Sequence, residues 1–200
     1  MISTIVIASG NPDKIVEIKD IFSQSGLRFK TLSDFKELPE IIEDGNTLEE
    51  NALKKARGIY DILGIPTIAD DTGLEVDALQ GAPGVRSARY AGNDVSYQEN
   101  LEKLLKEMME VPDTKRTARF RTIAVFYNGN QPIVSQGSVE GRITTEARGT
   151  SGFGYDPVFE SLETKQTFGE MTSKAKNAIS HRGRAFRNLY FELQQQKIVH

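Results

Sequence analysis

Residues 4–22 read TIVIASGNPDKIVEIKDIF, and this stretch decides the fold. The β-branched apolar run TIVIA predicts a strand, and the polar residues from Ser9 to Pro12 predict a turn after it. Pro12 suits the first position of a helix, because its missing N–H would find no partner there. Apolar residues then recur with helical spacing at Ile15, Ile18, Ile21 and Phe22. A strand, a turn and an amphipathic helix in this order begin an α/β fold.

The rest of the chain alternates similar elements and then adds a β-hairpin. Thr47 and Glu50 have the spacing of a capping box at a helix start, and Asn128-Gly129-Asn130 is a short hairpin turn. Further strands are expected over residues 27–32, 66–69, 118–127, 132–139 and 157–159, and further helices over 47–63, 96–108 and 182–195. The predicted fold class is therefore α/β, with a mixed central β-sheet flanked by helices, and residues 1–200 are expected to form a single domain.

Composition excludes several classes of function. The chain has no Cys and only 2 His, so disulfides, thiol nucleophiles and zinc sites built from Cys or His are ruled out, and any metal must be a hard cation held by oxygen. The 25 basic and 28 acidic residues give a net charge of −3, which argues against a duplex nucleic acid as partner. No apolar run reaches the length of a membrane span, and residues 1–8 lack the basic region and cleavage site of a signal peptide, so we expect a cytoplasmic protein without a membrane partner.

The turn S-G-N-P-D-K, residues 9–14, is the first candidate site. Backbone N–H groups at a helix start favour an anion such as phosphate, and Lys14 adds a mobile cation. The spacing is not that of a P-loop, so an ordinary turn with a solvated lysine remains the alternative. The candidate residues are Ser9, Gly10, Asn11, Pro12, Asp13 and Lys14.

Acidic residues provide the second candidate site. D-D-T-G-L, residues 70–74, follows a predicted strand. Holding two adjacent carboxylates close together costs free energy unless a cation or a proton compensates their charge. The pair therefore indicates a magnesium site or a general base. Because successive strand residues face opposite ways, only one of the two carboxylates should face the site. Glu43, on a loop before Gly45, is a possible second ligand, slightly ahead of its acidic neighbours. A surface Asx turn is the alternative for 70–74.

Two further segments carry aromatic and basic residues. In S-G-F-G-Y-D-P, residues 151–157, the glycines let the backbone approach a planar ligand such as a nucleobase, on which Phe153 or Tyr155 could stack. The alternative is that these aromatic side chains only pack in the core. In K-N-A-I-S-H-R-G, residues 176–183, hydrogen-bond donors gather near a helix start and could read base carbonyls or phosphate oxygens, although His181 could equally be a capping residue. These donors are Lys176, His181 and Arg182.

Five motifs in order resemble the inosine triphosphate pyrophosphatase family, and together they are far more specific than any one of them. They are S-G-N-x-x-K (9–14), A-D-D-T-G-L (69–74), G-A-P-G-V-R-S-A-R-Y-A-G (81–92), G-F-G-Y-D-P-V-F (152–159) and S-H-R-G (180–183). The resemblance implies a homodimer of an elongated mixed α/β fold, with two lobes around a central nucleotide-binding cleft. It also implies Mg²⁺-dependent hydrolysis of ITP, dITP and XTP to the monophosphate and pyrophosphate, which removes deaminated purines from the nucleotide pool.

The resemblance also assigns roles residue by residue. Residues 9–14 would hold the triphosphate, Asp71 would be the proton acceptor and a metal ligand, and Glu43 would be the second metal carboxylate. The remaining substrate contacts would be Thr72, Phe153, Gly154, Tyr155, Asp156, Lys176, His181 and Arg182. The chain has Ser9 where the family often has Thr, and Thr72 where it often has Ser, so both positions keep a hydroxyl.

Two other functions are compatible with parts of the pattern. A Maf-like pyrophosphatase on a similar scaffold would act on pyrimidine or methylated nucleotides. A regulatory module would bind ITP or GTP without hydrolysing it. The paired carboxylates favour an enzyme, because they have little purpose in a protein that only binds nucleotide.

Overall fold

A computed structural model describes residues 2–199, which fall into two compact units. Unit 1 contains the chain up to Asp71, Thr122–Gly137 and the chain from His181 onward; unit 2 contains Thr72–Arg121 and Ser138–Ser180. The chain passes from one unit to the other within three strands, of which β3 does so between Asp71 and Thr72.

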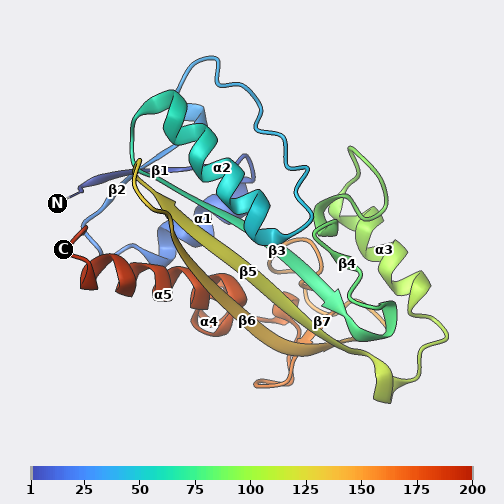
Figure 1. The fold of residues 1–200 in the computed structure, drawn as a ribbon. Helices are drawn as coiled ribbons and strands as arrows, with labels where there is room; N and C mark the ends of the chain where they lie inside the picture. The colour runs from blue at the N-terminus through green and yellow to red at the C-terminus, as the bar shows by residue number, and fades with distance from the viewer. Residues whose placement is uncertain (1, 200) are drawn as a thin grey trace. The chain divides into compact units, whose positions relative to one another are not determined.

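The structure is a mixed α/β fold, as predicted (Figure 1). Its strands are β1 Thr4–Ile7, β2 Arg28–Thr31, β3 Thr67–Val76, β4 Pro83–Gly84, β5 Thr117–Tyr127, β6 Ile133–Ile143 and β7 Phe159–Ser161. Its α-helices are α1 Pro12–Ile21, α2 Leu48–Leu63, α3 Tyr97–Glu107, α4 Ser173–Ile179 and α5 His181–Gln195. The sheet order is β2-β1-β3-β5-β6-β7, with β4 paired to β3. β1 runs parallel to β2 and β3, whereas β4 and β7 run antiparallel to their neighbours β3 and β6.

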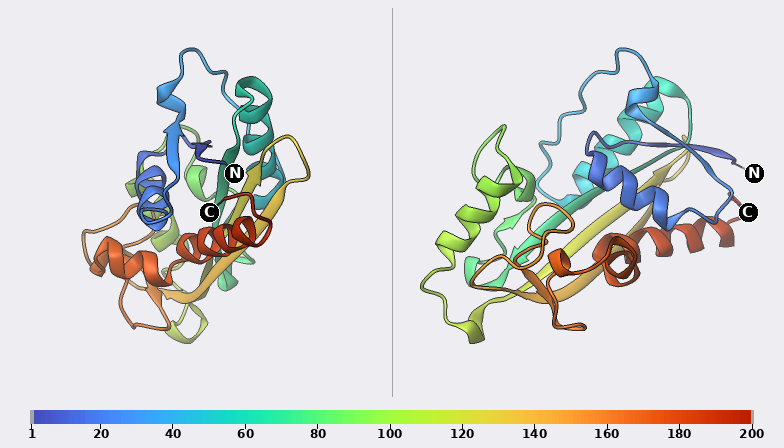
Figure 2. Two further views of the ribbon diagram at one scale, coloured as in Figure 1. Left: turned by 90° about the vertical axis from the view of Figure 1, so that its left-hand side faces the viewer. Right: turned by 180° about the vertical axis from the view of Figure 1, so that it is seen from behind.

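Unit 1 is built around the strand–turn–helix predicted at residues 4–22. Asn11 caps α1, because its side-chain oxygen accepts hydrogen bonds from the N–H groups of Asp13 at 2.9 Å and Lys14 at 3.2 Å, and Pro12 is the first helical residue. α1 packs against α5, and the two helices lie side by side in Figure 2. Their apolar faces and the strands enclose a core of Ile5, Ile7, Ile18, Phe22, Ile68, Ala124, Phe126, Ala185, Phe186, Leu189, Leu193 and Val199.

Unit 2 has its own core beneath α3, which begins after the Ser96 cap as predicted. The core residues are Leu74, Val76, Leu101, Leu104, Met108, Ala118, Phe120, Val139, Ile143, Tyr155, Val158, Phe159, Phe168 and Met171. Three of the phenylalanine rings pack on one another, with centroids of Phe120 and Phe159 4.7 Å apart and those of Phe159 and Phe168 5.2 Å apart. This aromatic packing fixes the segments that approach residues 153–156.

The largest difference from the sequence analysis concerns β3, which was expected over residues 66–69 only. The strand continues to Val76, so Asp70 and Asp71 lie inside it and neither a strand end nor an Asx turn carries them. The continuation pairs with β4, where Leu74 is opposite Gly84. A Cβ at Gly73 would lie 2.8 Å from the carbonyl oxygen of Gly84, so glycine here permits close approach of two backbones, a contact that sequence pattern does not reveal.

Smaller differences concern element ends. β7 covers Phe159–Ser161 instead of 157–159, and α4 was not predicted at all, because its seven residues are too few to show a helical period. The segment 81–92, expected to be a loop, contains β4. Thr47 does cap α2, accepting from the Glu50 N–H at 3.1 Å, but the Glu50 carboxylate accepts from the N–H of Asn46 at 2.6 Å rather than closing a capping box.

Candidate active site

Asp70 is the centre of a buried charge cluster in unit 1. Its carboxylate oxygen Oδ2 lies 3.2 Å from Lys14 Nζ on α1 and accepts a hydrogen bond from Arg182 Nε on α5 at 3.3 Å. The Asp70 side chain is fully shielded from solvent, that of Arg182 is 2% exposed and that of Lys14 is 16% exposed. Arg182 also donates to Glu17 Oε2. Lys14 is therefore an ion-paired residue and not a solvated lysine at an ordinary turn.

The charges of this cluster depend on one another. Burial opposes the ionisation of Asp70, but Lys14, Arg182 and Lys55 outweigh burial and hold the pKa of Asp70 well below its usual range. Burial likewise lowers the pKa of Lys14, although Asp70 opposes that shift. For Arg182, burial is outweighed by Asp70 and Glu17, so its pKa is raised. The cluster thus keeps an ionised aspartate beside two cations.

Asp71 faces different partners from Asp70, as the alternation of a strand requires. Its Oδ2 accepts a hydrogen bond of 3.0 Å from Asn51 Nδ2 on α2. Burial raises the pKa of Asp71, while Lys55, Lys14 and the bond from Asn51 oppose this shift and Glu43 adds to it. Asp71 is therefore a buried carboxylate whose pKa burial raises above its usual range.

Glu43 reaches the same cluster from the loop before α2. Its carboxylate lies 2.9 Å from Lys55 Nζ, and Lys55 Nζ also donates to the carbonyl oxygen of Asp70 at 2.6 Å. The Glu43 side chain is 36% exposed, so it remains accessible to solvent and ions. One lysine on α2 thus connects the Glu43 loop with β3.

The turn that precedes α1 is held by hydrogen bonds from its own backbone to its own side chains. Ser9 Oγ accepts from the N–H of Asn11 at 3.2 Å, and Gly10 is exposed. The α1 N-terminus presents its backbone dipole here, next to Lys14. A phosphate here would meet the Ser9 hydroxyl and the Lys14 ammonium within one short segment, because the N–H groups of Asn11, Asp13 and Lys14 already bond to side-chain oxygens of the turn.

In unit 2, Phe153, Asp156 and Lys176 form one compact group. The Lys176 ammonium lies 2.5 Å from Asp156 Oδ2 and 4.7 Å from the centroid of the Phe153 ring. Asp156 Oδ2 also accepts from the N–H of Phe153 at 2.8 Å, which fixes the backbone of the Gly-rich segment. Lys176 and Asp156 are both buried, whereas Phe153 is partly exposed. The arrangement offers an aromatic face backed by a cation.

Tyr155 does not offer a second stacking face. Its side chain is buried in the core of unit 2, and its hydroxyl donates to the carbonyl oxygen of Ser87 at 2.9 Å. Ser87 Oγ in turn accepts from the N–H of Leu74 and donates to the carbonyl oxygen of Gly84. Tyr155 thus anchors residues 153–156 to the segment 81–92, which explains the presence of that motif without a ligand.

The other predicted residues are divided between the two units. Within unit 1, His181 is the first residue of α5 and is buried, next to Arg182 in the chain. Thr72 begins the portion of β3 that belongs to unit 2 and is partly buried, and Gly154 has a positive φ of 63° that glycine adopts without strain. Unit 1 therefore collects Lys14, Glu43, Asp71 and Arg182, and unit 2 collects Phe153, Asp156 and Lys176.

Sequence reasoning missed four residues that hold the unit 1 cluster together. Asn51 and Lys55 are polar residues one helical turn apart, on the face of α2 that also carries Leu48, Ala52 and Ala56. A polar pair on an apolar face was a signal that could have been used, because buried polar groups require partners. Asp70 was considered only as the member of the pair that faces away from the site, and Glu17 on α1 was not considered. The full set is Glu17, Asn51, Lys55 and Asp70.

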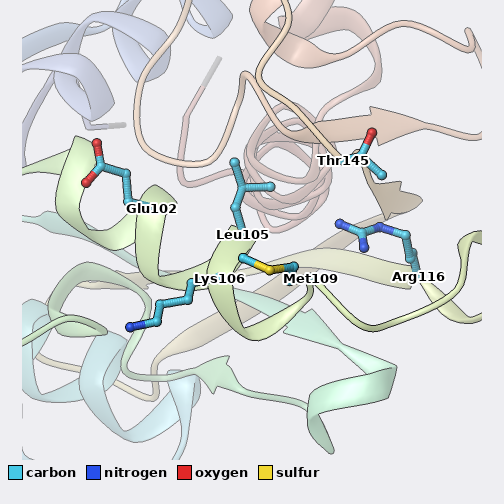
Figure 3. A pocket seen from close by; sticks show the side chains of 6 residues that line it. All are labelled: Glu102, Leu105, Lys106, Met109, Arg116 and Thr145. Atoms are coloured by element: carbon cyan, nitrogen blue, oxygen red, sulfur yellow. The ribbon is translucent and has the colours of Figure 1, made fainter.

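A pocket of about 430 Å³ in unit 2 involves none of these residues (Figure 3). It is lined by Glu102, Leu105, Lys106, Met109, Arg116 and Thr145. The buried Arg116 guanidinium donates to the carbonyl oxygens of Met108, Val111, Ile143 and Thr144. Since these backbone acceptors lie just after α3 and at the end of β6, the arginine has a structural role.

Two general features of the described chain bear on function. Residues 2–199 contain no group of three or more His, Asp or Glu side chains close enough to form a metal site on their own. None of the helices in that range has the length and apolar composition that crossing a lipid bilayer requires.

Comparison with known proteins supports the motif resemblance over nearly the whole chain. A sequence model of the Ham1 family matches residues 5–191. A dITP/XTP pyrophosphatase of Vibrio parahaemolyticus is 48% identical over 195 residues, which are 96% of this chain and 97% of that protein.

Solved structures agree with this relationship. A HAM1 protein from Coxiella burnetii superposes with a TM-score of 0.87 at 38% identity, covering 98% of this chain and all of its own. The Ham1 protein of Staphylococcus aureus gives a TM-score of 0.86 at 37% identity, with coverage of 96% and 99%. Hydrolases of this family generally depend on a metal ion. Matches of this extent in both sequence and fold show that the chain belongs to the Ham1 family.

Proposed function

We propose that this protein is a dITP/XTP pyrophosphatase, which hydrolyses ITP, dITP and XTP to the nucleoside monophosphate and pyrophosphate and so removes deaminated purines from the nucleotide pool. One observation carries the proposal beyond family membership: the buried carboxylate of Asp71 has a raised pKa and lies in the field of Lys55, Lys14 and Glu43. Such a group can take a proton from water beside a bound polyphosphate.

The triphosphate is assigned to the turn of residues 9–14 and the start of α1. The Ser9 hydroxyl and the positive end of the α1 dipole would attract phosphate oxygens, and Lys14 would offset charge on the departing pyrophosphate. Asp70 keeps the Lys14 ammonium in place, since the two are 3.2 Å apart. Asp70 is thus assigned a positioning role.

The residues present fit Mg²⁺ as the metal. Glu43 and Asp71 are both oxygen donors, and a magnesium ion typically takes one or two carboxylates and completes its shell with water and substrate phosphates. Burial raises the pKa of Asp71, so an added cation would stabilise its ionised form. When bound by Glu43 and Asp71, Mg²⁺ would supply charge neutralisation for the triphosphate.

Asp71 is assigned the proton transfer. It would orient a water molecule and accept its proton as the water oxygen forms a bond to the α-phosphorus, while the bond from that phosphorus to the bridging oxygen breaks and pyrophosphate leaves. The hydrogen bond from Asn51 to Oδ2 fixes the orientation of the Asp71 carboxylate for this task.

The base is assigned to Phe153 and to basic hydrogen-bond donors. Phe153 would stack on the purine, in a segment held by Asp156 and Tyr155. Hypoxanthine and xanthine carry a 6-oxo group where adenine carries an amino donor, so donors from Lys176, His181 or Arg182 would favour the first two. Loss of a matched hydrogen bond can discriminate by orders of magnitude. Thr72 and Gly154 are proposed as the remaining contacts.

The family resemblance also leads us to propose a homodimer in the cytoplasm, with neither a nucleic acid nor a membrane as partner. The net charge of −3 is compatible with that, because duplex nucleic acid requires a concentrated basic surface. Sedimentation of the purified protein would test the oligomeric state.

Pyrophosphate release from ITP, dITP, XTP, GTP, ATP and dTTP, with and without Mg²⁺, tests the proposal. We expect metal-dependent formation of monophosphate from the first three, in strong excess over ATP and GTP. Turnover led by dTTP, UTP or CTP would instead indicate a Maf-like enzyme, and saturable ITP binding without pyrophosphate release would indicate a regulatory module.

A variant pair tests the assignment of Asp71. Asp71→Asn should retain the fold and nucleotide binding and lose at least about 100-fold in kcat, the usual contribution of a general base. Asp61→Asn, an exposed substitution on α2, is the control and should behave like the parent. Parental turnover by folded Asp71→Asn would remove Asp71 from the chemistry.

A further inference from the structure

The loop that carries Glu43 is fastened along α2 by successive contacts. Five residues of the loop between Ile41 and Asn46 contact α2 in antiparallel order, so that their partners run from Gly58 back to Glu50. The pairs are Ile41 with Gly58, Glu43 with Lys55, Asp44 with Lys54, Gly45 with Asn51 and Asn46 with Glu50. Figure 1 shows this segment running beside α2. The loop has no regular secondary structure, yet its position is determined contact by contact.

Asn51 differs from the other members of this series because it has a second partner outside the loop. Its side-chain oxygen accepts from the N–H of Gly45 at 2.8 Å, and its Nδ2 donates to Asp71 Oδ2 at 3.0 Å. The residue is 1% exposed, so water does not substitute for either partner. One rigid amide therefore joins the β3 carboxylate to the loop two residues from Glu43.

The approach of the loop to Asn51 is unusually close. A Cβ placed on Gly45 would lie 2.6 Å from Asn51 Oδ1 and 2.8 Å from the Glu50 Cβ. Only glycine permits the loop backbone to come near enough for this bond. Gly58 leaves room for a loop side chain further along, since a Cβ there would lie 2.7 Å from Ile41 Cδ1.

We infer that Asn51 is a positioning residue, which sets the spacing of Asp71 and Glu43 by bonding to Asp71 with its amide nitrogen and to the Glu43 loop with its amide oxygen. Two carboxylates that share a cation must be held at a fixed separation, and each loses rotational freedom at a cost when the cation binds. Asn51 holds the Asp71 carboxylate and the Glu43 loop in place before the cation binds. This inference rests on the proposed function, because it assigns a purpose to the pairing of these two carboxylates.

Two substitutions separate the halves of this role. Asn51→Ala removes both hydrogen bonds, whereas Asn51→Asp keeps an acceptor for Gly45 and loses the donor to Asp71. The matched control is Asn100→Ala. Asn100 is 2% exposed, and its amide likewise bridges two groups, accepting from the N–H of Ala91 and donating to the carbonyl oxygen of Ala88, but none of its partners is a carboxylate.

Two measurements are made on each folded protein: hydrogen exchange at the Gly45 amide without metal, and pyrophosphate release from ITP as a function of Mg²⁺ concentration. For Asn51→Ala we expect faster Gly45 exchange and a rise of about 10- to 100-fold in the half-saturating Mg²⁺ concentration, or an equal loss in kcat/KM, as for other residues that orient metal ligands. Asn51→Asp should keep Gly45 protected and still lose kcat/KM. Asn100→Ala should change neither quantity.

The outcomes distinguish this inference from the proposed function. If the parent releases pyrophosphate and Asn51→Ala matches Asn100→Ala in both measurements, Asn51 is only structural and the inference is overturned. If the parent releases no pyrophosphate from any nucleotide, the proposed function fails, and with it the purpose assigned here to Asn51. Slow Gly45 exchange in Asn51→Ala would by itself contradict the contact with the loop.

Discussion

Replacing Asp70 by Asn should be among the most destabilising single-atom changes in this protein. The carboxylate is fully shielded from solvent, with Lys14 Nζ at 3.2 Å and Arg182 Nε at 3.3 Å. At an effective dielectric constant of about 20, each attraction amounts to about 5 kcal/mol, before the cost of desolvation. Because the variant leaves two cations buried around a neutral amide, the net loss should be about 3–5 kcal/mol, as for other broken buried ion pairs.

The assay is equilibrium unfolding by urea at pH 7, with Asp77→Asn as the control. Asp77 is also ion-paired, to Arg119 at 3.0 Å, but its side chain is 43% exposed, so this loss should be at most about 1 kcal/mol. Because both variants replace Asp by Asn, the difference between their losses in free energy of unfolding reports the effect of burial. An Asp70→Asn loss below about 1 kcal/mol, or one equal to that of Asp77→Asn, would refute the electrostatic account of the cluster.

The pH dependence provides an independent check. The pKa of Asp70 in the folded state lies below the unfolded value of about 3.9. A group of this kind adds stability that is present above the unfolded pKa and is lost as the pH falls through the folded-state pKa. The stability difference between parent and Asp70→Asn should therefore be constant between pH 7 and 5 and narrow only below about pH 4. A difference that vanished already at pH 5 would contradict the lowered pKa.

Two further predictions concern binding and packing. Lys14→Ala should raise the KM for ITP about tenfold or more in steady-state kinetics, because a charged contact to phosphate is lost. Lys19→Ala is the control, since Lys19 is exposed on the same helix, and should leave the KM unchanged. An unchanged KM for Lys14→Ala would mean that the turn has only a structural role. Gly137→Ala should lower the free energy of unfolding by about 1–3 kcal/mol, because its Cβ would lie 2.2 Å from the carbonyl oxygen of His181. Thermal unfolding measures this loss, with Val134→Ala at an exposed position of the same strand as the control. Equal melting temperatures of the two variants would show that β6 and α5 move apart without cost.

The local pattern predicted the elements whose cause is local. β1 and α1 follow from the alternation and spacing of residues 4–22, and the Asn11 cap and Pro12 at the first helical position act within a few residues of the chain. The same holds for the Ser96 cap of α3 and for Gly64, which ends α2 with a φ of 63°. Tertiary pairing extended β3 by seven residues beyond Ala69, through contacts with β4 that no window of the sequence contains.

The candidate site shows the same division. The types and order of residues in the chain pointed to Lys14, Lys176 and the pair of aspartates, and the family resemblance chose Asp71 from that pair. Their partners were not visible: Lys14 pairs with Asp70 from β3, and Lys176 pairs with Asp156 twenty residues earlier. Tyr155 was assigned a stacking role that its burial and its bond to Ser87 contradict.

The sequence by itself determined the chemistry: which hydroxyl, carboxylate, ammonium and aromatic groups are available, and that without Cys any metal must be bound by oxygen. The family and the α/β fold class followed from the same information. Only the tertiary structure decided which groups are neighbours, and therefore which carboxylate is held ionised by Lys14 and Arg182 and which has its pKa raised by burial. The reason is physical, because pKa values and ion pairing depend on distance and desolvation, and both arise only when segments far apart in the chain pack together.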